Sequence, residues 1–74
     1  MEGIKREKVS RKLRTLRGRR TLAEVAEAVG VTSQAVSQYE TGQRMPTDEV
    51  KLRIAKYYGK TVDEIFFNPK VSKT

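Results

Sequence analysis

Apolar residues recur every three or four positions in the first part of the chain, which is the spacing of one face of a helix. Val9, Leu13 and Leu16 form the first such stripe, and basic residues flank it. Gly18 follows the stripe and is typical of a helix end. We therefore predict a first helix that begins at about residue 7 and ends before this glycine.

A second helix is predicted to begin at Thr21. Thr21 and Glu24 have the spacing of a capping box, in which each side chain accepts a hydrogen bond from the other residue's backbone N–H. The apolar residues that follow fall on a single helical face. They are Leu22, Val25, Ala26 and Val29. Gly30 ends this helix and can adopt the left-handed conformation that a sharp turn needs.

A third, short helix is predicted from Thr32, its N-cap, to about Thr41, where Gly42 closes it. Its inner face consists of Ala35, Val36 and Tyr39. The segment that follows is predicted to be a loop, because Pro46 disfavours helix at the residue before it.

The last third of the chain predicts two more helical segments. Thr47 caps the first, and Gly59 ends it. Thr61 and Glu64 form a second capping box that opens a final turn or two. The apolar positions are Val50, Ile54, Tyr57 and Tyr58, widened by Leu52 and Ala55, and then Ile65, Phe66 and Phe67. Since no stretch alternates as a strand does, we predict an all-α domain over residues 7–67, between a basic arm (1–6) and a tail (68–74).

Composition narrows the classes of protein. The chain has 74 residues, which suit one domain, and it has neither cysteine nor histidine. Disulfides, thiolate metal ligands and the usual general base are therefore excluded, and we expect no cofactor and no metal. No apolar run approaches the ~20 residues that span a bilayer, and the N-terminus does not resemble a signal peptide. We expect a cytoplasmic protein.

The charge is strongly positive and unevenly distributed. The net charge of +7 divides into +7 over residues 1–20 (nine basic, two acidic), −4 over 21–50 (one basic, five acidic) and +4 over 51–74 (six basic, two acidic). A polyanionic partner suits this distribution, although a solvated basic face would produce the same numbers.

The second and third helices, with a three-residue connection that contains Gly30, predict a helix-turn-helix unit. Ala26 is small where the two helices cross, Gly30 permits the turn, and Val36 fills the angle between the helices. An arbitrary helical hairpin would not usually combine these residues with threonine caps on both helices.

The outer face of the third helix carries no charge. A surface helix normally presents lysine and glutamate, whereas this one presents the neutral side chains Ser33, Gln34, Ser37 and Gln38. A glutamine amide can pair with the N6 and N7 atoms of adenine in the major groove. The pattern therefore favours base recognition by the neutral face and phosphate binding by the basic residues around it.

With these residues in place, the chain resembles the Xre/Cro-repressor family of phage and bacterial helix-turn-helix regulators. The resemblance covers residues 7–67. It rests on segments 13–17, 21–42 and 59–66, together with Arg44 and Pro46. It implies a compact five-helix bundle, the lambda-repressor-like DNA-binding domain, encoded by a bacterium or a phage. It also implies a transcriptional regulator, most often a repressor, that reads an operator in double-stranded DNA through the major groove with its third helix.

The resemblance also implies roles for particular residues. The base-reading positions match Ser33, Gln34 and Gln38, with Ser37 adjacent. Thr32 is both N-cap and phosphate neighbour, and the loop after the third helix touches phosphate through Thr41, Gln43 and Arg44. A buried ion pair between the first and third helices maps onto Arg17 and Glu40, although the sequence alone makes Glu40 an ordinary surface acid.

Two departures from the family pattern affect the phosphate contacts. Many members carry glutamine in the first turn of the second helix, where this chain has Leu22. The connection that contains Arg19 and Arg20 is also about two residues shorter than the commonest form. We expect these two arginines, at the start of the second helix, to provide part of the phosphate binding.

Other functions remain open at this point. Such regulators act as homodimers, and the apolar residues near the C-terminus suit self-association as well as the core of the monomer: Tyr58, Val62, Ile65, Phe66 and Phe67. An antitoxin or another protein-interaction module is the alternative. A toxin-binding version usually needs an additional segment, and only residues 68–74 extend past the fold.

An enzyme and an RNA-binding protein fit the sequence less well. Asp63 and Glu64 are explained by the capping box, so the chain is predicted not to be an enzyme and to have no small-molecule substrate. A reader of single-stranded RNA would offer exposed aromatic rings, whereas all five aromatic residues lie from Tyr39 onward at core-like positions.

Overall fold

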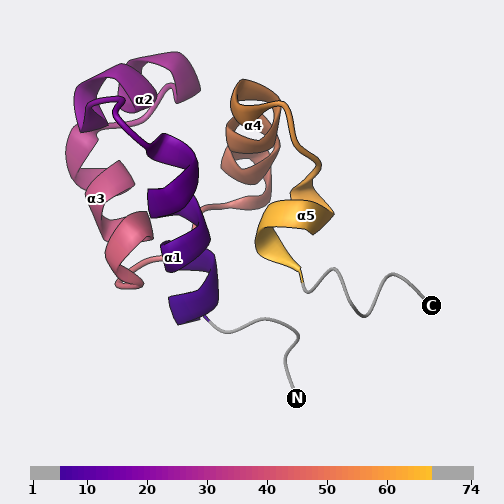
Figure 1. The fold of residues 1–74 in the computed structure, drawn as a ribbon. Coiled ribbons are helices and arrows are strands. Elements are labelled where there is room, and N and C mark those ends of the chain that lie inside the picture. Colours follow the sequence, from indigo (N-terminus) through magenta and orange to yellow (C-terminus); the bar gives the residue numbers. More distant parts are fainter. Residues whose placement is uncertain (1–5, 68–74) are drawn as a thin grey trace.

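A computed structural model describes residues 6–67 and contains five helices in that range (Figure 1). They are α1 (Arg6–Arg17), α2 (Leu22–Val29), α3 (Ser33–Thr41), α4 (Asp48–Tyr58) and α5 (Val62–Phe66). This described range contains no strand, so the all-α prediction and the five-helix bundle are confirmed. The helix α1 begins one residue before the expected start, because Arg6 is already helical. The rest of the predicted arm (1–5) and the predicted tail (68–74) lie outside the described residues.

Threonine N-caps set the starts of four helices. Thr21, Thr32, Thr47 and Thr61 each accept a hydrogen bond from the backbone N–H three residues later. Each bond satisfies one of the amide groups that a helix start leaves without an intrahelical partner. The two predicted capping boxes, at the starts of α2 and α5, are both formed. The sequence therefore placed these helix starts correctly.

The core lies where the helices meet. Figure 1 shows α2 and α3 on one side of α1, and α4 and α5 on the other. Helix α1 packs against α3 and α5, and α2 packs against α3 and α4. The buried apolar residues are Val9, Leu13, Val25, Ala26, Val29, Ala35, Val36, Tyr39, Ile54, Ala55, Ile65 and Phe66. Every helix contributes to this cluster, so no helix holds its position alone. None of the helices in the described range is long and apolar enough to cross a membrane.

Two apolar residues were placed wrongly by the sequence pattern. Leu52 is 62% exposed and Phe67 is 48% exposed, although both were assigned to core-like positions. Leu52 lies two residues from Val50 and from Ile54, and two residues correspond to about 200° around a helix. It therefore faces away from the stripe that packs on the core. Phe67 follows the last residue of α5 and has extended backbone, so the helix does not direct its ring inward.

The turn between α2 and α3 depends on a left-handed glycine. Gly30 has φ +87°, and its N–H donates to the carbonyl oxygen of Ala26 at 2.8 Å. The N–H of Val31 donates to the same oxygen at 2.9 Å, so two bonds close the end of α2. Ala26 and Val36 are both buried, as the predicted crossing of the two helices requires. The turn thereby fixes the angle at which α3 leaves α2.

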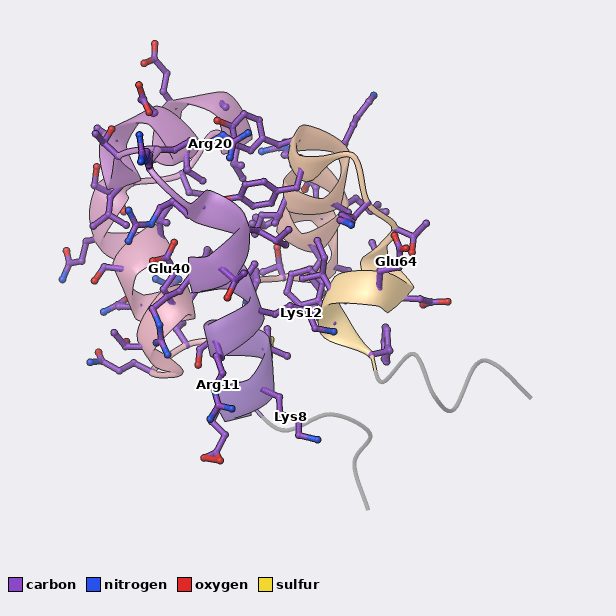
Figure 2. All side chains as sticks on the ribbon, in the orientation of Figure 1. Lys8, Arg11, Lys12, Arg20, Glu40 and Glu64 are labelled. Atoms are coloured by element: carbon purple, nitrogen blue, oxygen red, sulfur yellow. The ribbon has the colours of Figure 1, made fainter. Side chains whose placement is uncertain are left out.

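An ion pair joins α1 to α3. Nε of Arg17 lies 3.0 Å from Oε1 and 2.8 Å from Oε2 of Glu40, and Arg14 donates to the backbone carbonyl oxygen of Glu40. The Glu40 side chain is only 6% exposed, against 26% for the Arg17 side chain. The structure thus contains the ion pair that the family resemblance implied. Two arginines of α1 thus hold the C-terminal part of α3 at Glu40, which is labelled in Figure 2.

Replacing the turn glycine with alanine should destabilise the fold. Gly30→Ala forces an L side chain into the left-handed region, which costs about 1–2 kcal/mol. The added Cβ would also lie 3.2 Å from NH1 of Arg53, which is the end of a flexible side chain. Urea unfolding measures the loss. Gly59→Ala is the matched comparison for the contact, because Gly59 also has a left-handed φ of +71° but no atom within 4 Å of the added Cβ, so its loss should reflect the backbone cost alone. Equal stability of Gly30→Ala and wild type would contradict this view of the turn.

The two halves of the ion pair should be unequal in their effects on stability. Arg17→Met leaves the Glu40 carboxylate buried without its partner, which should lower the free energy of unfolding by about 3 kcal/mol. Glu40→Gln leaves a guanidinium that water can reach, so the loss should be smaller. Denaturant unfolding of both single variants and of the double variant measures the coupling. Additive single effects would show that the pair does not tie α1 to α3.

Candidate nucleic-acid interface

The outer face of α3 is a stripe of four uncharged polar side chains. Ser33 and Gln34 are exposed, and Ser37 and Gln38 are half-buried. Residues four apart lie on the same side of a helix, so these four form one continuous surface. The inner face of α3 is buried against the other helices and consists of Ala35, Val36, Tyr39 and Glu40. The structure therefore brings the four predicted base-reading residues together, outside the core.

Charge is absent from this face because of where the single charged residue of α3 lies. Among residues 33–41 only Glu40 is charged, and it is 4% exposed. Its carboxylate points to Arg17 in α1 and not to solvent. The exposed surface of α3 consequently offers hydrogen-bond donors and acceptors without the negative charge that would repel a phosphate backbone.

Polar residues lie at both ends of α3, and a basic residue lies beyond its C-terminal end. Thr32 precedes the helix, and its hydroxyl accepts from the N–H of Ala35 at 3.0 Å. Thr41, Gln43 and Arg44 follow at the other end, and all four of these predicted phosphate neighbours are exposed. Thr41 and Arg44 also contact Gln38, through its backbone oxygen and its side chain respectively.

The two arginines of the α1–α2 connection differ in their surroundings. Arg19 is exposed, and no hydrogen bond of its side chain is found within residues 6–67. The guanidinium of Arg20 lies 5.5 Å from the ring centres of both Tyr57 and Tyr58, which is the range of cation–π attraction. Arg20 also donates to the backbone oxygens of Leu16 and Arg17, at 3.1 and 3.4 Å (Figure 2). Its side chain thus connects the end of α1 to α4, a contact that the sequence did not indicate.

Tyr58 joins this cluster to the buried ion pair. The pKa of Tyr58 is raised to about 12, chiefly by burial and then by the negative charge of Glu40 and by Tyr57, while Arg20 and Arg17 partly oppose the rise. The hydroxyl therefore stays neutral over the whole physiological range. Tyr58 thus lies near Glu40 without adding a charge there.

Sequence reasoning missed two arginines with structural contacts. Arg14 is one of the basic residues that flank the first apolar stripe, and it donates to the backbone carbonyl oxygen of Glu40. Arg53 donates to the carbonyl oxygen of Val29, at the end of α2, and pairs with Glu49 at 2.7 Å. Glu49 and Arg53 have the four-residue spacing of a helical ion pair. No spacing rule indicates the two backbone oxygens, which lie 26 residues from Arg14 and 24 residues from Arg53 along the chain.

Nothing in the described range suggests a metal centre, since no three acidic, histidine or cysteine side chains lie close enough there to share an ion. The polar residues gathered around α3 are instead suited to hydrogen bonding and to binding anions.

Comparison with known proteins agrees with this geometry. A family model described as helix-turn-helix matches residues 11–65. The comparison with curated proteins produced no match.

Several solved structures are similar to this chain. The P22 c2 repressor protein, in complex with a synthetic operator, is 25% identical to this chain with a TM-score of 0.75, over 77% of this chain and 89% of the other. The clp gene regulator ClgR from Corynebacterium glutamicum is 27% identical with a TM-score of 0.73, over 99% and 97% of the two chains. The hypothetical transcription factor NHTF from Neisseria, 17% identical, shares the fold with a TM-score of 0.76, over 97% and 90%.

The family match spans most of the chain, and the solved structures named above share its fold. Members of this family are DNA-binding transcription regulators and not enzymes, which confirms the prediction that the chain has no catalytic activity. The chain belongs to the helix-turn-helix family of the Xre/lambda-repressor type.

Proposed function

We propose that this protein is a sequence-specific transcriptional repressor that reads an operator in double-stranded DNA by placing α3 in the major groove. One observation carries the proposal: the exposed face of α3 is free of charge while the chain as a whole carries +7. Base edges in the major groove are read by neutral donors and acceptors, and the phosphates around them by basic and polar groups. The separation of an uncharged polar face from basic residues elsewhere supports recognition of bases by the former face and of phosphates by the basic residues.

Ser33, Gln34, Ser37 and Gln38 are the proposed base-reading residues. Gln34 is exposed, and its amide has no hydrogen-bond partner within the described residues. It therefore offers a donor and an acceptor in one plane, which suits the N7 and N6 atoms of adenine. The serine hydroxyls accept or donate and read bases less strictly. Discrimination is accordingly expected to rest chiefly on the two glutamines.

The proposed phosphate contacts lie at both ends of α3 and in the α1–α2 connection. They are Arg19, Arg20, Thr32, Thr41, Gln43 and Arg44. All six residues are exposed. Arg20 would keep its place over the tyrosine rings and offer the remaining N–H groups of its guanidinium, since a guanidinium has five donors. The ion pair of Arg17 and Glu40 is proposed to orient α3 and not to contact DNA.

The comparisons support a DNA partner. The P22 c2 repressor, at 25% identity, is seen on a synthetic operator, and ClgR is a gene regulator. We propose the same class of partner for this chain and, from the first of these, the role of a repressor. The protein would accordingly reside in the cytoplasm, where bacterial DNA is found, and would need neither a cofactor nor a small-molecule substrate.

A homodimer is part of the proposal. Within residues 6–67 the exposed large apolar residues are Leu52, in α4, and Phe67, directly after α5, and neither belongs to α3. A second copy bound through them would leave both α3 faces free. Dimers of this kind place their recognition helices about 34–36 Å apart, one turn of DNA.

Selection of bound DNA from a random pool tests the proposal directly. The wild-type protein should select a motif with two-fold symmetry, whose half-sites are about one helical turn apart. Gln34→Ala should bind the selected duplex more weakly by about 1–3 kcal/mol and lose the preference at one base pair of each half-site. A pool without any enriched motif would reject sequence-specific recognition. Equal weakening on every sequence by Gln34→Ala would reject the role of this glutamine.

A further inference from the structure

The side-chain amide of Gln38 is already engaged at one end. NH1 of Arg44 donates to Oε1 of Gln38 over 3.3 Å. A guanidinium has donors only, so the amide oxygen is the atom that can face it. In the described part of the chain, no group accepts a hydrogen bond from the amide nitrogen of Gln38. The NH₂ group is therefore the part of this side chain that remains free for a ligand.

Backbone hydrogen bonds of the loop after α3 position Arg44 next to Gln38. The N–H groups of Gly42, Gln43 and Arg44 all donate to the carbonyl oxygen of Gln38, the last two at 3.0 and 3.3 Å. The hydroxyl of Thr41 reaches the same oxygen at 3.3 Å. Gly42, with φ +82°, provides the left-handed step that turns the chain back. Four donors thus fold the loop onto Gln38 and fix where Arg44 leaves the backbone.

The two glutamines of α3 therefore differ in chemistry, although both are on the same face. Gln34 has both ends of its amide free and can act as donor and acceptor together. In Gln38, Arg44 occupies one lone pair of the amide oxygen and holds that oxygen on the side of the loop, so the NH₂ group is the part that is presented to a ligand. In the major groove, adenine presents one acceptor and one donor, whereas guanine presents two acceptors, N7 and O6. An amide that presents its NH₂ group matches the guanine edge, where both groups are acceptors.

We propose that Arg44 determines the base preference of Gln38, by holding its amide oxygen so that the NH₂ group selects guanine over adenine. The inference rests on the proposed function, since it needs α3 to lie in the major groove. Arg44 is here a positioning residue that acts through Gln38, and its other N–H groups remain free for a phosphate. The specificity of the protein is then set partly outside α3, in the loop that follows it.

Competition binding on the selected operator tests the inference. The base pair read by Gln38 is the one whose preference disappears in Gln38→Ala. Wild-type protein should prefer guanine to adenine there by about fivefold or more. Arg44→Met frees the amide oxygen, so the preference should disappear or shift to adenine. In a Gln38→Ala background, Arg44→Met should leave the ratio of the guanine and adenine affinities at this base pair unchanged.

Arg19→Met is the matched control, because it removes the same charge from an exposed arginine without contact to Gln38. It should weaken the guanine and adenine duplexes by the same factor. The inference is overturned if wild type prefers adenine at this pair, or if Arg44→Met weakens both duplexes equally, as the control does. It is also overturned if Arg44→Met alters the preference without Gln38. All three outcomes leave sequence-specific binding intact, whereas failure to select any motif would overturn the proposed function itself.

Discussion

The buried pair of Arg17 and Glu40 is the interaction on which the candidate interface depends most. A carboxylate that is 6% exposed is stable only with a charged or hydrogen-bonding partner, and α1 supplies that partner. The pair has two consequences for α3. It fixes the helix relative to α1, with additional support from Arg14 at the backbone of Glu40. It also removes the single negative charge of α3 from the outer face, where that charge would oppose any approach to phosphate.

Contacts around this pair connect it to the rest of the molecule. Arg17 donates to the backbone oxygen of Arg20 at 2.8 Å, and the Arg20 guanidinium covers the rings of Tyr57 and Tyr58. Helix α4 is therefore linked through arginine side chains to the same point at which α1 holds α3. At the N-terminal end of α3, the turn at Gly30 fixes the direction in which the helix begins. The helix is constrained at both ends, while its outer face makes few contacts within the protein.

Much of this architecture could be predicted from the sequence, because its determinants are local. Threonine caps, the two capping boxes and the glycines after α2, α3 and α4 act within a few residues, and they placed the helix boundaries to within about one residue. The helical period also identified the face of α3 that carries Ser33 and Gln34, because packing leaves the opposite face of a short amphipathic helix exposed.

The contacts that depend on tertiary structure could not be predicted in the same way. Glu40 looks like a surface acid by spacing, and only the family resemblance pointed to its partner in α1. The positions of Arg14, Arg20 and Arg53 follow from how the helices pack, since long basic side chains reach whichever carbonyl or ring lies nearby. Leu52 was misassigned because a widened apolar stripe was taken to be buried, although its angle on α4 directs it to solvent.

The central claim is that the uncharged face of α3 and the loop after it form the DNA-binding surface. Titration of the isotopically labelled protein with its selected duplex, followed through backbone amide chemical shifts, tests this most directly. We expect the largest changes at residues 32–38 and 41–44, with smaller ones at 19–20. Changes concentrated instead on the exposed side of α4 and at the end of α5, around Leu52 and Phe67, would contradict it.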